Sequence, residues 1–297
     1  MIKPLLSAAL LTATLIYSVA LPSPVMAQAQ DVGQFSTFDA ESRLKVDTNP
    51  YRDILGALTV TELGRTLVAY DAAHTQALPY FAQYTDYLSH IPVERLNRDE
   101  QLAYWLNTRN FLLVQALSEE GRVSRFRKER GTPSDPGAFW TEKRITVSGV
   151  SLSLQDIEQD ILFKYWDNPN IIFGLYQGMA GGPTLPTEPF TAENVHSELE
   201  EKGSRFNSQR RNFRVRNEAV RISSYFDWYL PLAYGNDEAA LRDHLSSFAK
   251  ADQQNLVWSE VKLTRRKLST NFEQFRPREV IQQQGTGAAP TTRGLGS

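Results

Sequence analysis

The chain has 297 residues, of which 41% are hydrophobic and 22% are charged, a balance typical of a globular protein. The formal net charge of −2 argues against a general binder of nucleic acid or of anionic membranes. The chain contains no cysteine, which excludes disulfides, thiolate catalysis and cysteine-based metal sites.

The first 27 residues have the pattern of a secretory signal peptide. Lys3 gives a short positive start, residues 5–21 are mostly apolar, and the sequence ending at Ala27 matches the small-residue cleavage pattern. The alternative is an uncleaved membrane anchor, for which the apolar stretch is slightly short. We expect cleavage after Ala27, an exported protein that is periplasmic or secreted, and no stable membrane anchor afterwards.

The two ends of the remaining chain differ in composition from its middle. Residues 28–50 are polar with few apolar side chains, and we interpret them as a flexible lead-in. Residues 276–297 hold a Gln run followed by Gly, Ala, Thr and Pro, which is typical of a disordered tail. Residues 51–275 are predicted to form a single α+β domain, predominantly helical, with two β-hairpins and a small, mainly antiparallel sheet.

Residues 101–117 form the longest apolar-rich segment after the N-terminus and contain no Gly or Pro. Apolar residues recur there at helical spacing, which predicts a helix over residues 99–120 and makes it the most buried element. Asn107 and Asn110 are three residues apart and therefore neighbours on its surface. A buried amide needs hydrogen-bond partners, so these side chains either tie loops to the helix or line a pocket.

Two helices are predicted before this segment. Thr59 and Glu62 have the spacing of a capping box and predict a helix that continues to Tyr70. A second helix is expected over residues 78–88, which carry a row of aromatic side chains: Tyr80, Phe81, Tyr84 and Tyr87. We favour a core position for this row over a platform on which a ligand stacks.

The segments after residue 140 predict hairpins and short helices. Residues 144–152 alternate around a Ser-Gly turn, and Ser153 with Asp156 is expected to cap a helix that carries Glu158, either a surface acid or a pocket residue. A second hairpin is expected over residues 212–222. Further elements are predicted as follows: helices over 192–206, 225–230 (ended by Pro231) and 238–249, and a strand over 256–263.

Residues 171–176 are apolar and predict a short strand buried on both faces. The loop that follows, from Gln177 to Pro183, contains Gly178, Gly181 and Gly182, so its backbone N–H groups can converge on an anion or an oxyanion. It lacks the Lys-Ser/Thr ending of a P-loop and the spacing of a dinucleotide fingerprint.

Little in the sequence points to a metal or a cofactor. The four histidines, at positions 74, 90, 196 and 244, are scattered without metal-ligand or triad spacing, and each is expected at the surface. We therefore expect no cofactor and no metal. The basic run over residues 121–137 is either an anion-binding loop or, more simply, a solvated segment.

Several segments together resemble one family, the domain of unknown function 547. The helix with Trp105, Asn107 and Asn110 resembles its "F-W-I-N-x-Y-N" helix. The other matching segments, in the same order, are Ser151–Glu158, Phe173–Leu185, Phe190–Val195, Phe213–Ile222 and Leu268–Asn271.

The departures from the family pattern fall in the strand and loop. Family members typically have "R-x-H-F-A-L-x-C-G-x-x-S-C-P-P-L" there, and the Arg and His positions are Asn170 and Ile172 in this chain. The two Cys positions are Gln177 and Gly182, and Arg109 replaces a Tyr-like residue in the helix. If the family uses a thiol and an imidazole, this chain cannot do so.

Two functions are consistent with the sequence. The favoured one is a non-catalytic module for a peptide, glycan or protein partner, or for a small polar ligand, with no nucleic-acid partner. Its pocket residues would be Asn107, Asn110, Glu158, Gln177 and Gly178. The alternative is a thiol-free hydrolase or acyltransferase with papain-like or transglutaminase-like ancestry. It would draw on Ser151, Ser153, Tyr104, Glu158 and Gln177, with loop N–H groups as an oxyanion hole.

Overall fold

The computed structural model describes residues 32–120, 131–216, 219–259, 262–269, 271, 273 and 274. Its helices are α1 (Asn49–Leu58), α2 (Tyr70–Gln76), α3 (Leu78–Ser89), α4 (Arg98–Glu119), α5 (Ala138–Thr141), α6 (Phe163–Tyr165), α7 (Ile171–Gly174), α8 (Val195–Ser208), α9 (Tyr225–Ala233), α10 (Glu238–Ser246) and α11 (Gln254–Trp258). Short 3-10 helices are η1 (Val32–Ser36), η2 (Val93–Arg95) and η5 (Ala251–Gln253), and η4 (Asp156–Leu162) is a π-helix.

The strands form four separate small sheets. They are β1 (Thr59–Glu62) with β2 (Arg65–Val68), β3 (Gly131–Thr132) with β4 (Asp135–Pro136), β5 (Lys143–Val147) with β6 (Val150–Ser153), and β7 (Phe213–Arg216), β8 (Ala219–Ser223) and β9 (Leu263–Arg266). Both predicted hairpins are present, as β5–β6 and β7–β8. The pairing of β8 with β9 is parallel. The α+β fold is confirmed, although the strands do not gather into one sheet.

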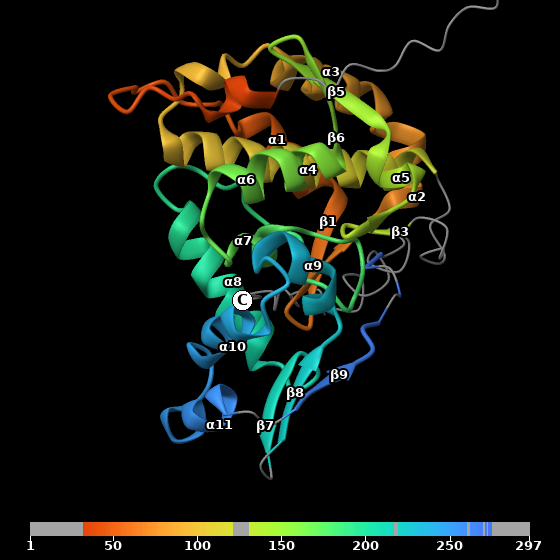
Figure 1. Cartoon of the computed structure of the whole chain (residues 1–297). Helices are drawn as coiled ribbons and strands as arrows, with labels where there is room; N and C mark the ends of the chain where they lie inside the picture. The colour runs from red at the N-terminus through yellow and green to blue at the C-terminus, as the bar shows by residue number, and fades with distance from the viewer. Residues whose placement is uncertain are drawn as a thin grey trace, which may run out of the picture. The chain divides into compact units, whose positions relative to one another are not determined.

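Helix α4 is the centre of the domain, as its apolar pattern predicts (Figure 1). Its first turn is capped by Asn97, whose side chain accepts a hydrogen bond from the backbone N–H of Glu100 at 2.9 Å. Eighteen of its 22 residues are buried, because α2, α3, η4 and α8 all pack against it. Polar side chains on this helix must therefore find partners inside the protein.

The prediction of a helix from Thr59 to Tyr70 is wrong, because these residues form the β1–β2 hairpin. The chain reverses at Leu63 and Gly64, which have φ angles of 49° and 73°. A two-residue turn with both φ angles positive matches the twist of paired strands. Thr59 does not cap a helix start; its hydroxyl donates to the carbonyl of Leu55 at 2.8 Å, at the end of α1.

The prediction of a strand over residues 171–176 is also wrong. Burial is as expected, but Ile171 to Gly174 form the single turn α7, started by the carbonyls of residues 168–170. An apolar run of this length fits a buried strand and a buried helical turn equally well. Similarly, the strand expected over 256–263 is split into α11 and β9. Pro231 lies inside α9 rather than at its end.

The domain starts before residue 51. Phe35 in η1 is fully buried and packs edge-on against Trp105, with ring centroids 4.9 Å apart. Gln101 also donates from its side chain to the carbonyl of Thr37 at 2.7 Å. The described part of the predicted lead-in therefore packs on α4.

Three sequence predictions fall outside the described residues: the signal peptide, the basic residues 121–130 and the tail 276–297. Within the described ranges, no helix combines the length and the apolar character that a membrane crossing requires.

Candidate functional site

Asn107 and Asn110 connect α4 to two loops. The side-chain amide of Asn107 donates to the carbonyl of Phe190 at 2.8 Å and accepts from the N–H of the same residue at 2.9 Å. Asn110 donates to the carbonyl of Gly174 at 2.8 Å and accepts from the N–H of Tyr176 at 3.0 Å. Both side chains therefore satisfy backbone groups of loops that pass over the helix.

Glu158, for which the sequence left a surface position and a pocket position open, lies in the core. Its side chain is 1% exposed and accepts from Arg109 Nε at 2.6 Å and from the Tyr229 hydroxyl at 3.1 Å. Burial raises the pKa of Glu158, and the Arg109 guanidinium and the Tyr229 hydroxyl partly offset this effect. The partner that holds Glu158 is 49 residues away in the sequence, on α4.

Arg109 is the hub of this buried cluster. Its guanidinium donates to Glu158, to the side chains of Asn110 and Gln177, both at 3.3 Å, and to the carbonyl of Tyr176. Its Cζ atom lies 5.6 Å from the centre of the Trp140 ring. The sequence pointed to this position only as a departure from the family pattern. The guanidinium of Arg109 lies between α4 and the loop that carries Tyr176 and Gln177. Protein atoms therefore fill that space.

Gln177 completes the cluster on the side of α9. Its amide donates to the Tyr229 hydroxyl at 2.6 Å and to the carbonyl of Leu175 at 3.3 Å, and its side chain is 2% exposed. Three predicted site residues, Asn110, Glu158 and Gln177, thus contact Arg109, while Asn107 bonds Phe190 instead. All four are at most 4% exposed. They form a polar core with satisfied partners rather than a surface pocket.

The glycine-rich loop does not present an open set of N–H groups. The N–H of Ala180 donates to the carbonyl of Asn271 at 2.8 Å, and the N–H of Gly181 donates to that of Ser269 at 2.9 Å. Gly178, with φ of 73°, accepts from the N–H of Glu273 at 2.9 Å. Two of the N–H groups that the predicted oxyanion hole would use, those of Ala180 and Gly181, therefore donate to the C-terminal segment instead. Gly181 is required because a Cβ there would lie 2.6 Å from the N and O atoms of Ser269.

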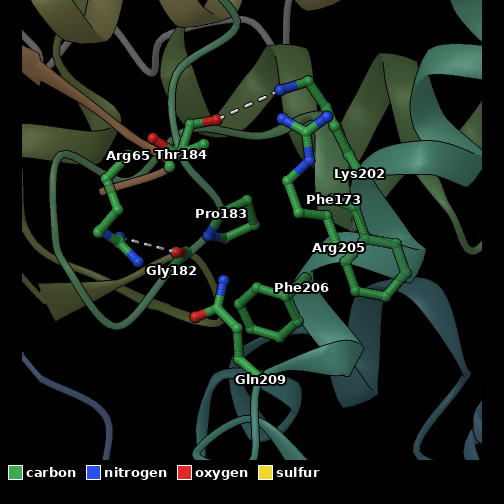
Figure 2. Close-up of a pocket in the computed structure, with 10 residues that line it drawn as sticks. Arg65, Phe173, Gly182, Pro183, Thr184, Lys202, Arg205, Phe206 and Gln209 are labelled. Atoms are coloured by element: carbon green, nitrogen blue, oxygen red, sulfur yellow. Dashed lines mark hydrogen bonds between the residues drawn. The ribbon is translucent and has the colours of Figure 1, made fainter. Parts of the chain in front are cut away.

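A small cationic cavity lies beside this loop, between β2 and α8 (Figure 2). Arg65 points toward the carbonyl of Gly182, and Lys202 donates to the carbonyl of Thr184 at 3.4 Å. Its volume of about 20 Å³ is that of a water site, not of an organic ligand. Burial lowers the pKa of Lys202 to about 8. Burial also raises the pKa of Glu273, the ion-pair partner of Arg65, to about 7.

A larger groove lies between α1 and α3, with a volume of about 560 Å³. It is lined by Pro50, Asp53, Ile54, Ala57, Leu58, Ala77, Tyr80, Gln83, Tyr84 and Tyr87. The aromatic row of α3, expected in the core, is divided here. Phe81 and Tyr84 are buried, whereas Tyr80 is 64% exposed at the groove.

The residues named for a hydrolase have structural roles. Ser153 Oγ accepts from the N–H of Asp156 at 3.1 Å and donates to its carboxylate at 2.7 Å, which is the predicted cap of the next helix. Ser151 Oγ lies 3.0 Å from the Thr146 hydroxyl, and Tyr104 donates to the carbonyl of Leu88. In each case the hydroxyl is used to hold local structure.

The histidine prediction needs one correction, at His244. It lies between the Tyr234 hydroxyl at 2.7 Å and the side-chain oxygen of Asn170 at 2.8 Å, packed on Phe173. Burial lowers its pKa to about 4. Among the residues that the structure describes, no three His, Asp or Glu side chains are grouped to hold a metal ion.

Fold and site together define an α+β domain whose central helix ties two loops and an acid into a buried polar core. Residues 93–206, which run from η2 through most of α8, match the family described as "Protein of unknown function, DUF547". This match over residues 93–206 confirms the resemblance for that segment. Comparisons with curated proteins and with solved structures gave no match.

Proposed function

We propose that the chain is an exported, non-catalytic binding protein that holds an apolar side chain of a polypeptide partner in the groove between α1 and α3. The groove itself is the observation that carries this proposal. Its volume of about 560 Å³ lies within the usual range for ligand sites, roughly 300–1,000 Å³. A filled polar core around Arg109 supports the non-catalytic part, because no substrate can reach Glu158 or Gln177 there.

The lining of the groove favours a polypeptide over a glycan. Its floor is aliphatic and aromatic, with Tyr84 stacked on Tyr51 at 5.7 Å and on Tyr87 at 5.9 Å between ring centroids. Apart from tyrosine hydroxyls, its polar side chains are Asp53 and Gln83. A sugar needs many hydrogen bonds, whereas an apolar side chain needs a dry floor and a few polar groups for the adjacent backbone.

Tyr80 gives the groove an exposed anchor. Tyrosine supplies a large, rigid and amphipathic contact area and loses little conformational entropy on binding. Such residues are common where a partner docks, and Tyr80 has most of its surface open to solvent. We therefore expect Tyr80 to contribute most of the binding free energy.

The test is an NMR titration with the N-acetyl amides of Trp, Phe and Leu, and with N,N′-diacetylchitobiose as the sugar probe. In the wild type we expect an apolar amino-acid amide to shift the ring signals of Tyr80 and Tyr84. Ala57→Trp, at an exposed position in the lining, would fill the groove and abolish these shifts. Leu63→Trp, at a site 97% exposed and outside the groove, is the matched control.

The proposal would be contradicted if only the sugar probe shifted the tyrosine ring signals. It would also be contradicted if the Ala57→Trp and Leu63→Trp variants bound the amino-acid amides equally well. The hydrolase alternative is tested on the same samples, because cleavage of the amide or of the sugar releases products that mass spectrometry detects.

A further inference from the structure

The three-stranded sheet at the C-terminal end of the domain separates its side chains by charge. Arg214 lies directly opposite Arg221, and Arg216 lies opposite Ala219. Residues two apart on a strand, and residues directly opposite on neighbouring strands, point to the same face. Arg266, opposite Ser223, belongs to the same face. The other face carries the buried apolar side chains: Phe213, Val220, Ile222 and Leu263.

The arginines of this outer face have no acidic partner in the part of the chain that the structure describes. Among the described residues, none of Arg214, Arg216, Arg221 and Arg266 is in an ion pair, and all but the half-buried Arg214 are exposed. Their neighbour Arg265 points to the opposite face and contacts Asp227 at 2.7 Å and Glu238 at 3.3 Å. Strand β9 thus carries Arg265, which is paired with acids, next to Arg266, which has no acidic partner among the described residues.

This arrangement is unfavourable for the sheet by itself. Like charges directly opposite on two strands repel each other and destabilise the pairing. The net charge of the whole chain is −2, so the positive charge is concentrated locally while acids prevail elsewhere. A bound anion between the guanidinium groups would remove the repulsion.

A hollow is present where such an anion would lie. It has a volume of about 310 Å³ and is lined by Arg214, Arg216, Arg221 and the small Ala219, which leaves space opposite Arg216. A second hollow of about 450 Å³ shares Arg214 and Arg216 with the first, and Arg210 and Lys250 add two further cations there.

We propose that Arg214, Arg216 and Arg221 form a binding site for a phosphate ester. Guanidinium forks match the oxygens of a phosphate group, which carries close to two negative charges and three acceptor oxygens. One carboxylate would leave most of the charge of three arginines uncompensated. A single-stranded nucleic acid would need aromatic side chains for stacking, and the hollow between the three arginines has none.

The site is independent of the groove between α1 and α3, so either proposal can fail alone. The first measurement is isothermal titration of the purified protein with sodium pyrophosphate at low ionic strength, where exposed charges are least screened. Citrate and a short single-stranded DNA are the comparison ligands. A co-sedimentation arm uses phosphatidylcholine vesicles with and without phosphatidic acid, whose phosphate is a monoester, and it separates a lipid headgroup from a soluble phosphate as the source.

The variant is Arg214→Gln with Arg221→Gln, and its matched control is Arg43→Gln with Arg95→Gln. Both control arginines are exposed and lie outside this sheet, so the net charge changes equally. We expect the sheet variant to bind pyrophosphate, or phosphatidic acid vesicles, at least about tenfold more weakly, since it loses two charge-assisted contacts. The control should remain within about twofold of the wild type.

Binding of pyrophosphate, of phosphatidic acid vesicles or of both, lost only in the sheet variant, supports the proposal. It is overturned if neither binds, if both double variants weaken binding equally, or if citrate or DNA binds at least as tightly as pyrophosphate. It is also overturned if the sheet variant melts at a lower temperature than the wild type, because the arginines would then be structural.

Discussion

Arginines in two regions of this molecule have opposite environments. Arg109, at the middle of α4, is fully buried, and its guanidinium contacts a carboxylate, two amide oxygens and a backbone carbonyl. Arg221, on the outer face of β8, is exposed and faces Arg214 rather than an acid. A charge in the core must be paired because the interior cannot solvate it, whereas a charge at the surface is solvated by water.

The comparison shows which of the two regions is available for function. Around Arg109 the hydrogen-bonding groups are already used by the protein, so the cluster specifies how the loops lie on α4. Around Arg221 the described part of the protein does not use the hydrogen-bonding groups of the guanidinium. The repulsion between neighbouring guanidinium groups therefore remains until an anion binds. The predictions below therefore expect large effects on stability in the first region and small ones in the second.

The largest effect is expected for Arg109→Met, which leaves Glu158 buried without its positive partner. Breaking a buried ion pair on one side costs about 3 to 5 kcal/mol of unfolding free energy. Urea denaturation of the wild type and the variant measures it. The double variant Arg109→Met with Glu158→Leu should recover most of the loss, since it removes both charges. If the Arg109→Met variant were as stable as the wild type, Glu158 would have to be solvated, or protonated without any loss of unfolding free energy.

Asn107→Ala should cost about 3 kcal/mol, because it leaves the N–H and the carbonyl of Phe190 buried without partners. The same urea titration measures this loss. Gln159→Ala, on the exposed surface near Glu158, is the control and should change stability by less than about 0.5 kcal/mol. Equal effects of the two substitutions would show that the amide of Asn107 does not hold the loop.

Glu273 should make stability depend on pH. Burial raises its pKa from 4.5 to about 7, so the folded protein binds a proton more tightly than the unfolded chain. This contribution to stability is complete below pH 4.5 and is lost as the pH rises through 7. Each pKa unit corresponds to about 1.4 kcal/mol, so we expect a loss of about 2 to 3 kcal/mol.

The Glu273→Gln variant isolates this effect from other titrating groups. Unfolding free energies of the wild type and the variant, measured between pH 4.5 and 7.5, should differ progressively, with the wild type losing more. Parallel pH profiles would show that the carboxylate of Glu273 is solvated.

The smallest effect is expected for Arg221→Gln, in the second region. Removing one of two opposed positive charges should leave the unfolding free energy unchanged or raise it by a few tenths of a kcal/mol at low salt. Differential scanning calorimetry at low and high salt measures this, and the gain should disappear at high salt because the repulsion is screened. A loss of more than about 1 kcal/mol would place Arg221 with Arg109 as a structural residue.

Several elements follow from local sequence signals. Asn97 caps α4 and Ser153 with Asp156 caps the next helix, because a cap is set by residues three positions apart. The hairpins β5–β6 and β7–β8 follow from alternation around a turn. Alternation also puts Arg214 and Arg216 on one face, although it does not show what lies opposite them.

The wrong predictions concern two kinds of segment. In one, the apolar residues follow no period; in the other, the hydrogen-bond partner lies far away in the sequence. The apolar run of Ile171 to Tyr176 has no period to separate a strand from a helical turn. The N–H groups of the glycine-rich loop are taken by Ser269 and Asn271, residues about ninety positions later. No local pattern around Gly181 announces that contact.

The sequence by itself determined the α+β class, the position of the central helix and the main hairpins, since these depend on local spacings. It also gave the resemblance to the family, which depends on the order of several short segments along the chain. Only the tertiary structure decided what the polar residues do. Glu158 is buried because Arg109 comes from another helix. Arg221 has no acid directly opposite it, because the described neighbouring strands supply arginine and threonine there. Charge compensation depends on distance in space, and that distance is a property of the fold.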